Sequence, residues 1–292
     1  METLQIDHQL SPIAVILINI VFWGGIISLL AWLIRTRFGI KSLAGCKIRR
    51  NNMPFYFPFT PLLIWFGIIW VMISASRIFW PELADWQKAL VDNLSLCAGA
   101  TVGTGVIIYL ARDSFARRLK GLGLDIKTSG RDFLWGWVNL ISTWPLVSLA
   151  LIVTVLVGEA LFGPGFKIGQ HAELELITAY PQISLRVLIF LTAVLVAPVF
   201  EEMLFRGMFQ SMLRSYTKGP WLAIAISSGL FAAVHGNVSH WPALFVLGGC
   251  MGYSYERSGS LLRPIFIHSI FNATSVIGTI LFYSSESVAM VG

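Results

Sequence analysis

Charged residues are scarce in this chain. Asp, Glu, Lys and Arg make up only 12% of the 292 residues, whereas hydrophobic residues make up 56%. Because an ordinary soluble domain carries about 25% charged residues, this composition excludes a typical water-soluble protein. The sequence instead predicts an integral membrane protein whose helices are surrounded by lipid.

Cysteine is also scarce, and two hydrolase motifs are missing. Cys46, Cys97 and Cys250 are odd in number and form no Cys-x-x-Cys pair, so we expect them to pack rather than to form disulfides or bind metal. The chain has neither the His-Glu-x-x-His motif of zinc proteases nor the Gly-x-Ser-x-Gly motif of serine hydrolases. These absences argue against two common classes of hydrolase.

Long apolar runs account for most of the sequence. Since a membrane-crossing helix needs about 20 apolar residues, we predict an all-α fold, a polytopic transmembrane helix bundle with about eight transmembrane helices. The runs cover residues 13–33, 59–75, 89–111, 133–156, 183–200, 221–235, 242–255 and 264–283. We interpret residues 1–180 as scaffold helices without recognisable chemistry, and residues 181–284 as the helical core that carries the function.

Basic residues gather in the loops after the first and third runs. Cytoplasmic loops of membrane proteins carry an excess of Lys and Arg, so we predict that both loops are cytoplasmic and that the N-terminus lies on the other side. The formal net charge of +6 then reflects topology and attraction to anionic lipid head groups. We therefore expect membrane lipid as a partner and no nucleic acid. From the compact chain and the absence of a transit peptide, we expect a location in a bacterial plasma membrane.

Beyond residue 180, polar side chains occur within or at the ends of the apolar runs. An ionised side chain at the centre of a transmembrane helix costs about 2.5–3.5 kcal/mol on insertion scales, so each needs a partner or a function. The candidate site residues are Glu201, Glu202, Arg206, His235, His268 and Asn272.

Helical spacing gives the two adjacent carboxylates different predicted roles. Glu202 and Arg206 are four residues apart and share a helix face, which favours an ion pair. Glu201 points about 100° away, so we predict that it is the available base. Pro198 has no N–H, so we expect the carbonyl of Val194 to be unpaired and the helix to kink one turn before the carboxylates.

The histidines divide into two groups. His235 ends the segment Phe231-x-x-x-His235, and His268 shares a helix face with Asn272 at a spacing of four residues. These two elements and the glutamates can converge on one cavity. His8, His171 and His240 lie in predicted tails or loops, and we interpret them as solvated polar residues. The segment 158–182 is predicted either to cover the bundle or only to connect two helices.

The segments Glu201-Glu202-x-x-x-Arg206, Phe231-x-x-x-His235 and His268-x-x-x-Asn272 together resemble the three motifs of the CPBP family of intramembrane proteases. This family includes the CAAX prenyl proteases and bacteriocin self-immunity proteins, and the resemblance covers residues 185–283. It implies a glutamate-dependent endopeptidase that hydrolyses a membrane-anchored protein or peptide near the cytoplasmic membrane face. Glu201 and His235 would activate water, and His268 and Asn272 would hold the oxyanion.

Three alternatives remain open. We expect no cofactor, but Glu201, His235 and His268 are also a possible set of three ligands for a catalytic zinc ion. A non-catalytic scaffold, sensor or immunity protein would keep the polar cluster as a lock between helices. A transporter would use buried Glu, Arg and His as an ion pathway, although the sequence has no evident inverted repeat.

Overall fold

The computed structural model describes residues 12–217 and 219–289, and over these ranges the regular elements are helices. Within them, the only strand-like pairing is an isolated bridge between Asn51 and Phe115. The prediction of an all-α membrane fold is therefore confirmed. The long uninterrupted helices are α1 (Pro12–Thr36), α2 (Phe59–Phe79), α3 (Asp85–Ser114), α5 (Ser129–Phe162) and α12 (Leu262–Ala289).

Shorter helices complete the bundle. A continuous helical rod of five segments carries the two glutamates: α7 (Ile183–Leu191), η2 (Thr192–Val196), α8 (Ala197–Glu202), η3 (Met203–Gln210) and α9 (Ser211–Thr217). The other elements are α4 (Arg118–Leu122), η1 (Ile126–Thr128), α6 (Ala172–Ala179), α10 (Pro220–Ala233), η4 (Val238–His240) and α11 (Trp241–Ser258).

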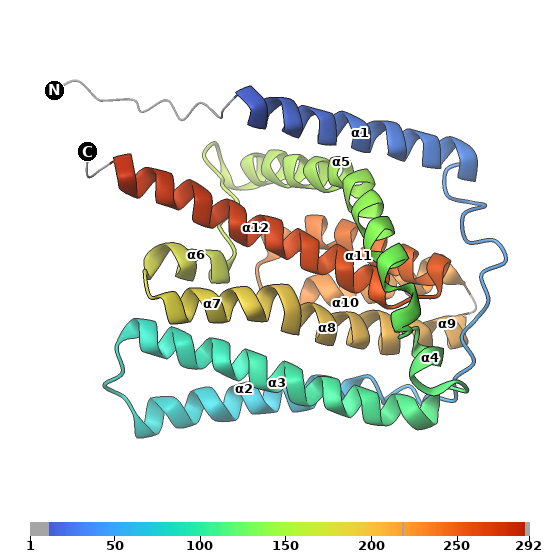
Figure 1. Ribbon diagram of the computed structural model, residues 1–292, viewed down its shortest axis with the longest axis horizontal. Coiled ribbons are helices and arrows are strands. Elements are labelled where there is room, and N and C mark those ends of the chain that lie inside the picture. The colour runs from blue at the N-terminus through green and yellow to red at the C-terminus, as the bar shows by residue number, and fades with distance from the viewer. Residues whose placement is uncertain (1–11, 218, 290–292) are drawn as a thin grey trace.

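The helices form layers around the α7–α9 rod. α1 packs on α5 at one side of the bundle, α2 and α3 pair at the other side, and the rod lies between them with α10, α11 and α12 (Figure 1). α5 contains Pro145 and bends along its length. Large apolar side chains face outward from these layers, such as Trp70 and Leu161, each 72% exposed, which is the pattern expected of a surface covered by lipid.

Six of the described helical stretches are long and apolar enough to cross a membrane, so the predicted count of eight spans is not confirmed. They are Ile18–Thr36, Phe59–Phe79, Asp85–Ser114, Ile126–Phe162, Ile183–Thr217 and Leu262–Leu281. The fifth is much longer than the predicted run 183–200, because the helix continues past Arg206 to Thr217.

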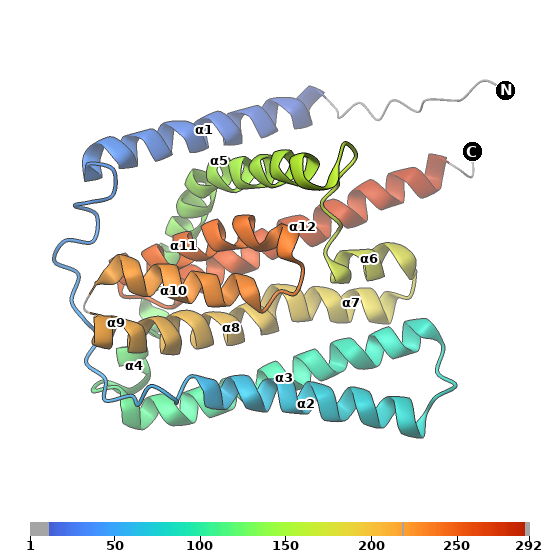
Figure 2. The same cartoon turned by 180° about the vertical axis from the view of Figure 1, so that it is seen from behind.

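The sixth and seventh predicted spans are the two that fall short. At about 1.5 Å per residue, the 14 residues of α10 rise about 21 Å, less than the roughly 30 Å of a hydrocarbon core. α10 leaves the end of α9, and α11 returns to the same end of the bundle without reaching the far end (Figure 2). The pair therefore forms a hairpin whose tip stops short of the far end of the bundle. Two full crossings would have carried His235 and His268 towards opposite faces.

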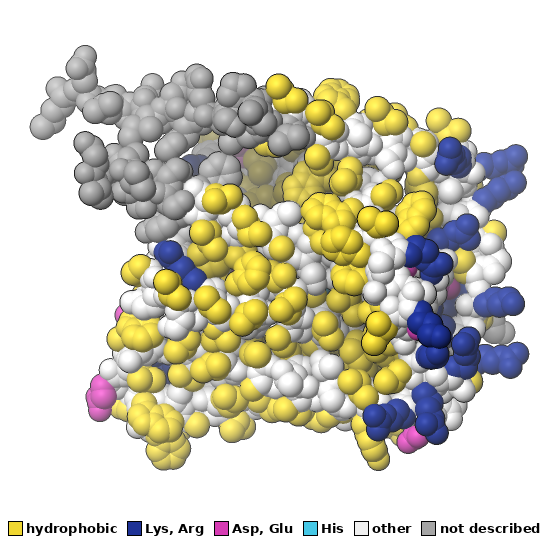
Figure 3. All heavy atoms as spheres, in the orientation of Figure 1, with side chains coloured by type: hydrophobic (Ala, Val, Ile, Leu, Met, Phe, Trp, Pro, Cys, Tyr) yellow, Lys and Arg dark blue, Asp and Glu magenta, His cyan; other side chains and the backbone are white. Residues whose placement is uncertain are grey.

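Basic side chains gather at one end of the molecule. In Figure 3 the Lys and Arg side chains crowd the right-hand end, where α1, α3, α9 and α11 end and α12 begins. We call this the basic end. Both described termini of the chain lie at the other end (Figure 1). The arrangement has the asymmetry from which we predicted a cytoplasmic location for the basic loops.

Candidate active site

The rod that carries Glu201 and Glu202 departs twice from α-helical geometry. The η2 and η3 segments are π-helical turns on either side of α8, and such turns are frequent at functional sites. In η2 the N–H of Ala197 donates to the carbonyl of Thr192, five residues back. In that register the next donor to the carbonyl of Ala193 would be Pro198, which has no N–H.

Asn272 satisfies this carbonyl. Its Nδ2 donates to the carbonyl of Ala193 at 2.8 Å, so α12 is bound to the π-helical turn next to the glutamates. The sequence predicted a backbone irregularity at Pro198, but it assigned the unpaired carbonyl to Val194 because it assumed an α-helical register. The π-helical turn moves the irregularity by one residue and gives Asn272 a structural contact that the motif did not predict.

Glu202, Arg206 and His268 form a buried chain of polar contacts. Arg206 Nη1 lies 2.6 Å from Glu202 Oε1, and both side chains are fully buried, so the predicted ion pair is present. The same carboxylate oxygen accepts a hydrogen bond from His268 Nδ1 at 3.1 Å. Glu202 Oε1 therefore binds two groups at once, and it fixes both the guanidinium and the ring orientation of His268.

Phe231 is the apolar centre of this cluster. The Arg206 guanidinium lies 4.5 Å from the centroid of its ring, and the ring centroids of His235 and His268 lie 4.6 and 5.5 Å from it. Phe231 is completely buried. The Phe in Phe231-x-x-x-His235 thus positions three polar side chains at once, which the spacing of the motif alone did not indicate.

A ladder of polar contacts joins the rod to α11. Arg206 Nη2 donates to the carbonyl of Gly248 at 3.2 Å, and Gln210 Nε2 donates to the carbonyl of Gly252 at 3.0 Å. One turn further on, Arg214 Nε lies 2.9 Å from Glu256 Oε1. All three contacts join residues 42 positions apart. The two helices therefore run parallel and in register towards the basic end.

Glu201 lies on the other side of the same helix and has no hydrogen-bond partner for its Oε2 atom. That oxygen lies 3.8 Å from His235 Nε2 and 4.0 Å from His268 Nε2. These distances are too long for direct hydrogen bonds, but a water molecule fits between such groups as a bridge. Glu201 therefore faces both predicted histidines, whereas Glu202 is committed to the ion pair.

The backbone fixes the tautomer of His235. Its Nδ1 lies 2.7 Å from the carbonyl oxygen of Phe231, and since that oxygen can only accept, Nδ1 carries the hydrogen. In the neutral ring, Nε2 then presents a lone pair towards Glu201. A water molecule between Glu201 and His235 would meet two acceptors, which is the arrangement needed to draw protons from it.

These groups lie at one end of a cavity of about 1070 Å³. Helices of both halves of the chain line it, including Asn93 and Ala100 of α3 and Val147 of α5. All the predicted site residues except Glu202 and Arg206 also line it. The two exceptions are the pair buried behind the site. Residues 1–180 therefore supply cavity walls as well as outer helices.

The segment between α5 and α7 covers the cavity and corrects the interpretation of two histidines. The rings of His171 and His240 stack at 5.1 Å, and that of His171 meets His235 edge-on at 6.1 Å. His171 and His240 also line the cavity, a position that we did not predict, and both remain partly exposed. Their positions depend on contacts between distant segments, which no local pattern indicates. His8 lies outside the described residues.

A carboxylate accompanies His171. Glu173 Oε2 lies 2.8 Å from His171 Nδ1. This hydrogen bond raises the pKa of His171 and lowers the pKa of Glu173. A second acid–histidine pair therefore lies beside His235, on the segment that covers the cavity.

The zinc alternative can be compared with this geometry. Two ligand atoms on a tetrahedral zinc, each about 2.0–2.1 Å from the metal, lie about 3.3 Å apart. The corresponding distances from Glu201 are longer, at 3.8 and 4.0 Å. Among the described residues, no group of three His, Cys, Asp or Glu side chains meets the geometry for a metal. Dependence on a metal is a question for a chelation experiment.

Comparison with known proteins supports the resemblance. Residues 183–274, which include all six predicted site residues, match the family model "Type II CAAX prenyl endopeptidase Rce1-like". An Escherichia coli chain named "Uncharacterized 24.3 kDa protein" is 33% identical over 121 residues, which are 40% of this chain and 56% of the relative. The Bacillus subtilis "Putative membrane peptidase YdiL" is 30% identical over 117 residues, 38% of this chain and 45% of the relative.

The extent of these matches is limited. The chain spans about half the length of the curated relatives it matches. No solved structure matches it. The match confirms the family resemblance of the C-terminal segment and supports a membrane peptidase; the reaction and the substrate of this chain belong to the proposal below.

Proposed function

We propose, on the premise that residues 183–274 are of the CAAX prenyl endopeptidase type, that this protein is a glutamate-dependent endopeptidase of a bacterial plasma membrane. It hydrolyses a peptide bond of a membrane-anchored protein or peptide. The observation that carries the proposal is the unpaired Glu201 oxygen, which faces the Nε2 atoms of His235 and His268 at 3.8 and 4.0 Å.

Water activation follows from the two acceptors. Glu201 and the Nε2 lone pair of His235 each accept a hydrogen bond from one water molecule. As the water oxygen attacks the carbonyl carbon of the substrate, one water proton moves to Glu201. General-base assistance of this kind contributes about 100- to 10,000-fold in rate.

The remaining groups serve the tetrahedral intermediate and the leaving group. In its doubly protonated form, His268 donates from Nδ1 to Glu202 and has an Nε2–H directed into the cavity, where it can hold the oxyanion. One amide hydrogen of Asn272 is bound to Ala193, and the other is left for the substrate. Glu201 then returns its proton to the leaving nitrogen as the C–N bond breaks, which yields a carboxylic acid and an amine.

Two alternatives fit this geometry less well. A purely structural lock would hold both glutamates by direct contacts. Glu202 has two such contacts, both through Oε1, whereas Glu201 Oε2 has no direct hydrogen bond and lies 3.8 and 4.0 Å from the two histidine nitrogens. A transporter needs a polar path to both faces. Between Glu202 and the basic end, the polar side chains of the rod are buried against α11 and do not line the cavity, as in Arg206, Gln210 and Arg214.

The test is cleavage of a library of quenched fluorogenic peptides with a lipid anchor, by the full-length protein in detergent and in lipid. We expect the wild type to cleave some members, the folded Glu201→Gln variant to cleave none, and Glu82→Gln to match the wild type. Glu82 is an exposed glutamate remote from the cavity. A wild type that is folded but cleaves nothing would favour the non-catalytic lock.

Chelation separates the metal-free mechanism from the zinc alternative. In the proposed mechanism Glu201 and His235 activate water without a metal, so we expect cleavage to be unchanged after incubation with EDTA or 1,10-phenanthroline. Loss of cleavage that zinc restores would contradict the mechanism and assign Glu201, His235 and His268 to a metal.

A further inference from the structure

The exposed part of the cavity lining lies along one rim. Among its lining residues, the exposed ones all belong to two segments, residues 169–175 before and within α6 and residues 236–237 at the tip of the α10–α11 hairpin. The lining residues of α3, α5, α8, α11 and α12 are buried or partly buried. We call the two exposed segments the mouth of the cavity.

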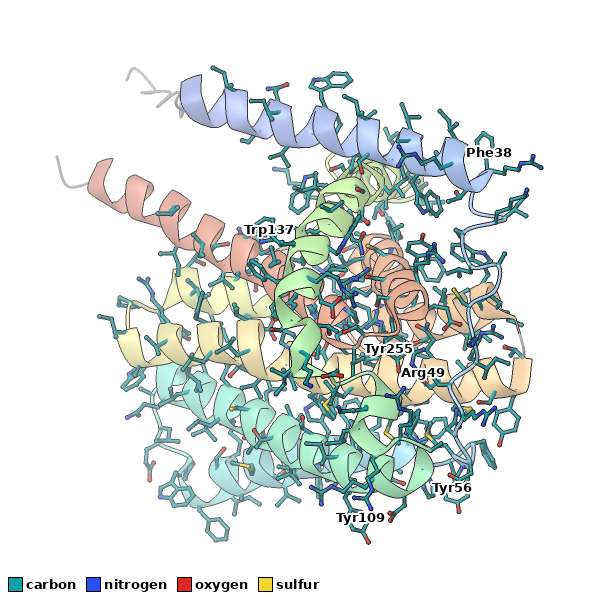
Figure 4. All side chains as sticks on the ribbon, turned by 45° about the vertical axis from the view of Figure 1, so that its right-hand side comes forward. Phe38, Arg49, Tyr56, Tyr109, Trp137 and Tyr255 are labelled. Carbon is teal, nitrogen blue, oxygen red and sulfur yellow. The ribbon has the colours of Figure 1, made fainter. Side chains whose placement is uncertain are left out.

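The opposite end of the site is closed by packing. Beyond Arg206 and Gln210, the hydroxyl of the buried Tyr255 donates to the carbonyl of Leu122 at 2.8 Å. The guanidinium of Arg49 lies 3.6 Å from the Tyr255 ring centroid and donates to the Tyr255 carbonyl at 2.9 Å (Figure 4). The loop after α1 is thereby fastened across the basic end.

The closed end is the end that sequence rules assign to the cytoplasm. The closure also uses the contacts of Glu256 with Arg49 and Arg214. The helices α9 and α11, which carry Arg214 and Glu256, end where Lys and Arg side chains crowd the surface (Figure 3). An excess of Lys and Arg marks cytoplasmic loops. The mouth, by contrast, lies between α6 and the hairpin tip, on the side of the site away from the basic end (Figure 2).

The cavity extends from the middle of the span towards the far side. At about 1.5 Å per residue along the rod, Glu201 lies about 27 Å from Ile183 and about 24 Å from Thr217. Glu201 is therefore near the middle of the span, and the cavity extends from it towards the Ile183 end, where it meets Ile189, Thr192 and the segment before α6.

The charge of the lining indicates which peptides fit. Glu173, Glu175 and Glu201 line the cavity, whereas its lining residues include no Lys or Arg. A negatively charged flank, such as a free C-terminal carboxylate, would meet no Lys or Arg there, and a basic flank would be attracted to the glutamates.

Resting on the proposed peptidase function, we infer that the substrate enters from the non-cytoplasmic face of the membrane, through the mouth, and that a neutral or basic flank of the peptide lies against Glu173 and Glu175. This inference departs from the family resemblance, which implies cleavage near the cytoplasmic face. It follows from three observations in this chain: the exposed rim, the sealed basic end and the lining charge.

Cysteine labelling tests the side of the mouth without requiring activity. In a full-length Cys46→Ser background, Gln170→Cys places a thiol at the mouth and Lys47→Cys places one at the basic end; both parent residues are exposed. A membrane-impermeant maleimide should label Gln170→Cys in right-side-out vesicles and Lys47→Cys in inverted vesicles. The background variant measures reaction of Cys97 and Cys250. Labelling of Gln170→Cys only in inverted vesicles overturns the inference.

Cleavage from each side tests the route itself. A membrane-impermeant fluorogenic peptide that is cleaved in detergent should be cleaved by right-side-out vesicles, and by inverted vesicles only after detergent is added. Cleavage by intact inverted vesicles alone overturns the inference. Absence of cleavage in detergent contradicts the proposed function instead, and the labelling result still decides the side of the mouth. A Lys-flanked peptide should show a lower KM than its Glu-flanked counterpart, with the difference reduced in Glu175→Gln.

Discussion

The contacts of the rod differ on the two sides of the adjacent residues Glu201 and Glu202. From Glu202 towards the basic end, the long polar side chains of the rod are bound to α11, in the Arg206–Gly248, Gln210–Gly252 and Arg214–Glu256 contacts. From Glu201 towards the mouth, the carboxylate meets the cavity without a direct hydrogen bond to Oε2. One residue of helix therefore separates a region specialised for stability from a region left available for chemistry.

The largest effects should be on turnover, from substitutions on the cavity side. Glu201→Gln and His235→Ala each remove one of the two acceptors for the water, so we expect each to lower kcat by about 100- to 10,000-fold. Since both act on the same water, the double variant should be little worse than the more damaging single variant. Peptide cleavage measures this loss, and thermal unfolding should be nearly unchanged.

Substitutions on the buried side should instead lower the stability of the fold. Arg206→Ala leaves the Glu202 carboxylate buried without its cation, a change that costs about 3–5 kcal/mol in the free energy of unfolding. Chemical unfolding of the purified variant in mild detergent measures this loss. Combining it with Glu202→Gln should restore part of the stability, because no charge is then left unpaired. Equal destabilisation by Glu201→Gln would refute the division between the two carboxylates.

Disturbing the close contact between the rod and α11 should have a smaller effect on the free energy of unfolding. A Cβ atom on Gly252 would lie 2.7 Å from Gln210 Oε1 and 3.0 Å from Ile224 Cγ2, so Gly252→Ala should cost about 1–3 kcal/mol through overpacking. Gly249 lies in the same helix, and a Cβ there meets nothing within 4 Å. Gly249→Ala is therefore the matched control and should unfold like the wild type or at slightly higher temperature. Similar losses in both variants would contradict close packing as the cause.

The buried side was also the easier side to predict. The spacing of Glu202 and Arg206 follows from helical geometry, and three short motifs were enough to bring Glu201, His235 and His268 together in a hypothesis. The all-α fold class and the positions of the apolar helices follow from the composition and from the lengths of the apolar runs. These patterns do not show which backbone carbonyl loses its donor. The carbonyl is that of Ala193 instead of Val194 because of a π-helical turn, and the spacing of hydrophobic residues does not predict such a turn.

The cavity side was harder to predict because it depends on contacts between distant segments. Nothing local to His171 or His240 indicates that they stack on each other beside His235. Likewise, α10 has the apolar composition of a transmembrane helix. That it does not cross the membrane is evident only from the fold, in which α11 returns beside the rod. Sequence rules located the residues of the site, while the path by which a substrate reaches them required the fold.

The smallest expected effect concerns the His171–Glu173 pair at the mouth. Its hydrogen bond raises the pKa of His171, so the pair stabilises the covering segment fully below the unfolded-state pKa of 6.5 and loses that contribution as pH rises through the higher folded-state value. The pKa of Glu173 is lowered, so its contribution is present above 4.5 and lost as pH falls through the lower folded-state value.

Both side chains are partly exposed, which limits the effect on global stability. The local effect is better measured by the reactivity of a thiol in the same segment. In the Gln170→Cys variant, maleimide labelling should be slowest between the two folded-state pKa values and should accelerate as pH rises above that of His171. In a Glu173→Gln background, the acceleration should shift to lower pH, because His171 loses the carboxylate that holds its proton. An unchanged profile in that background would show that the covering segment is held by packing alone, and that the ion pair at the mouth contributes nothing to closing it.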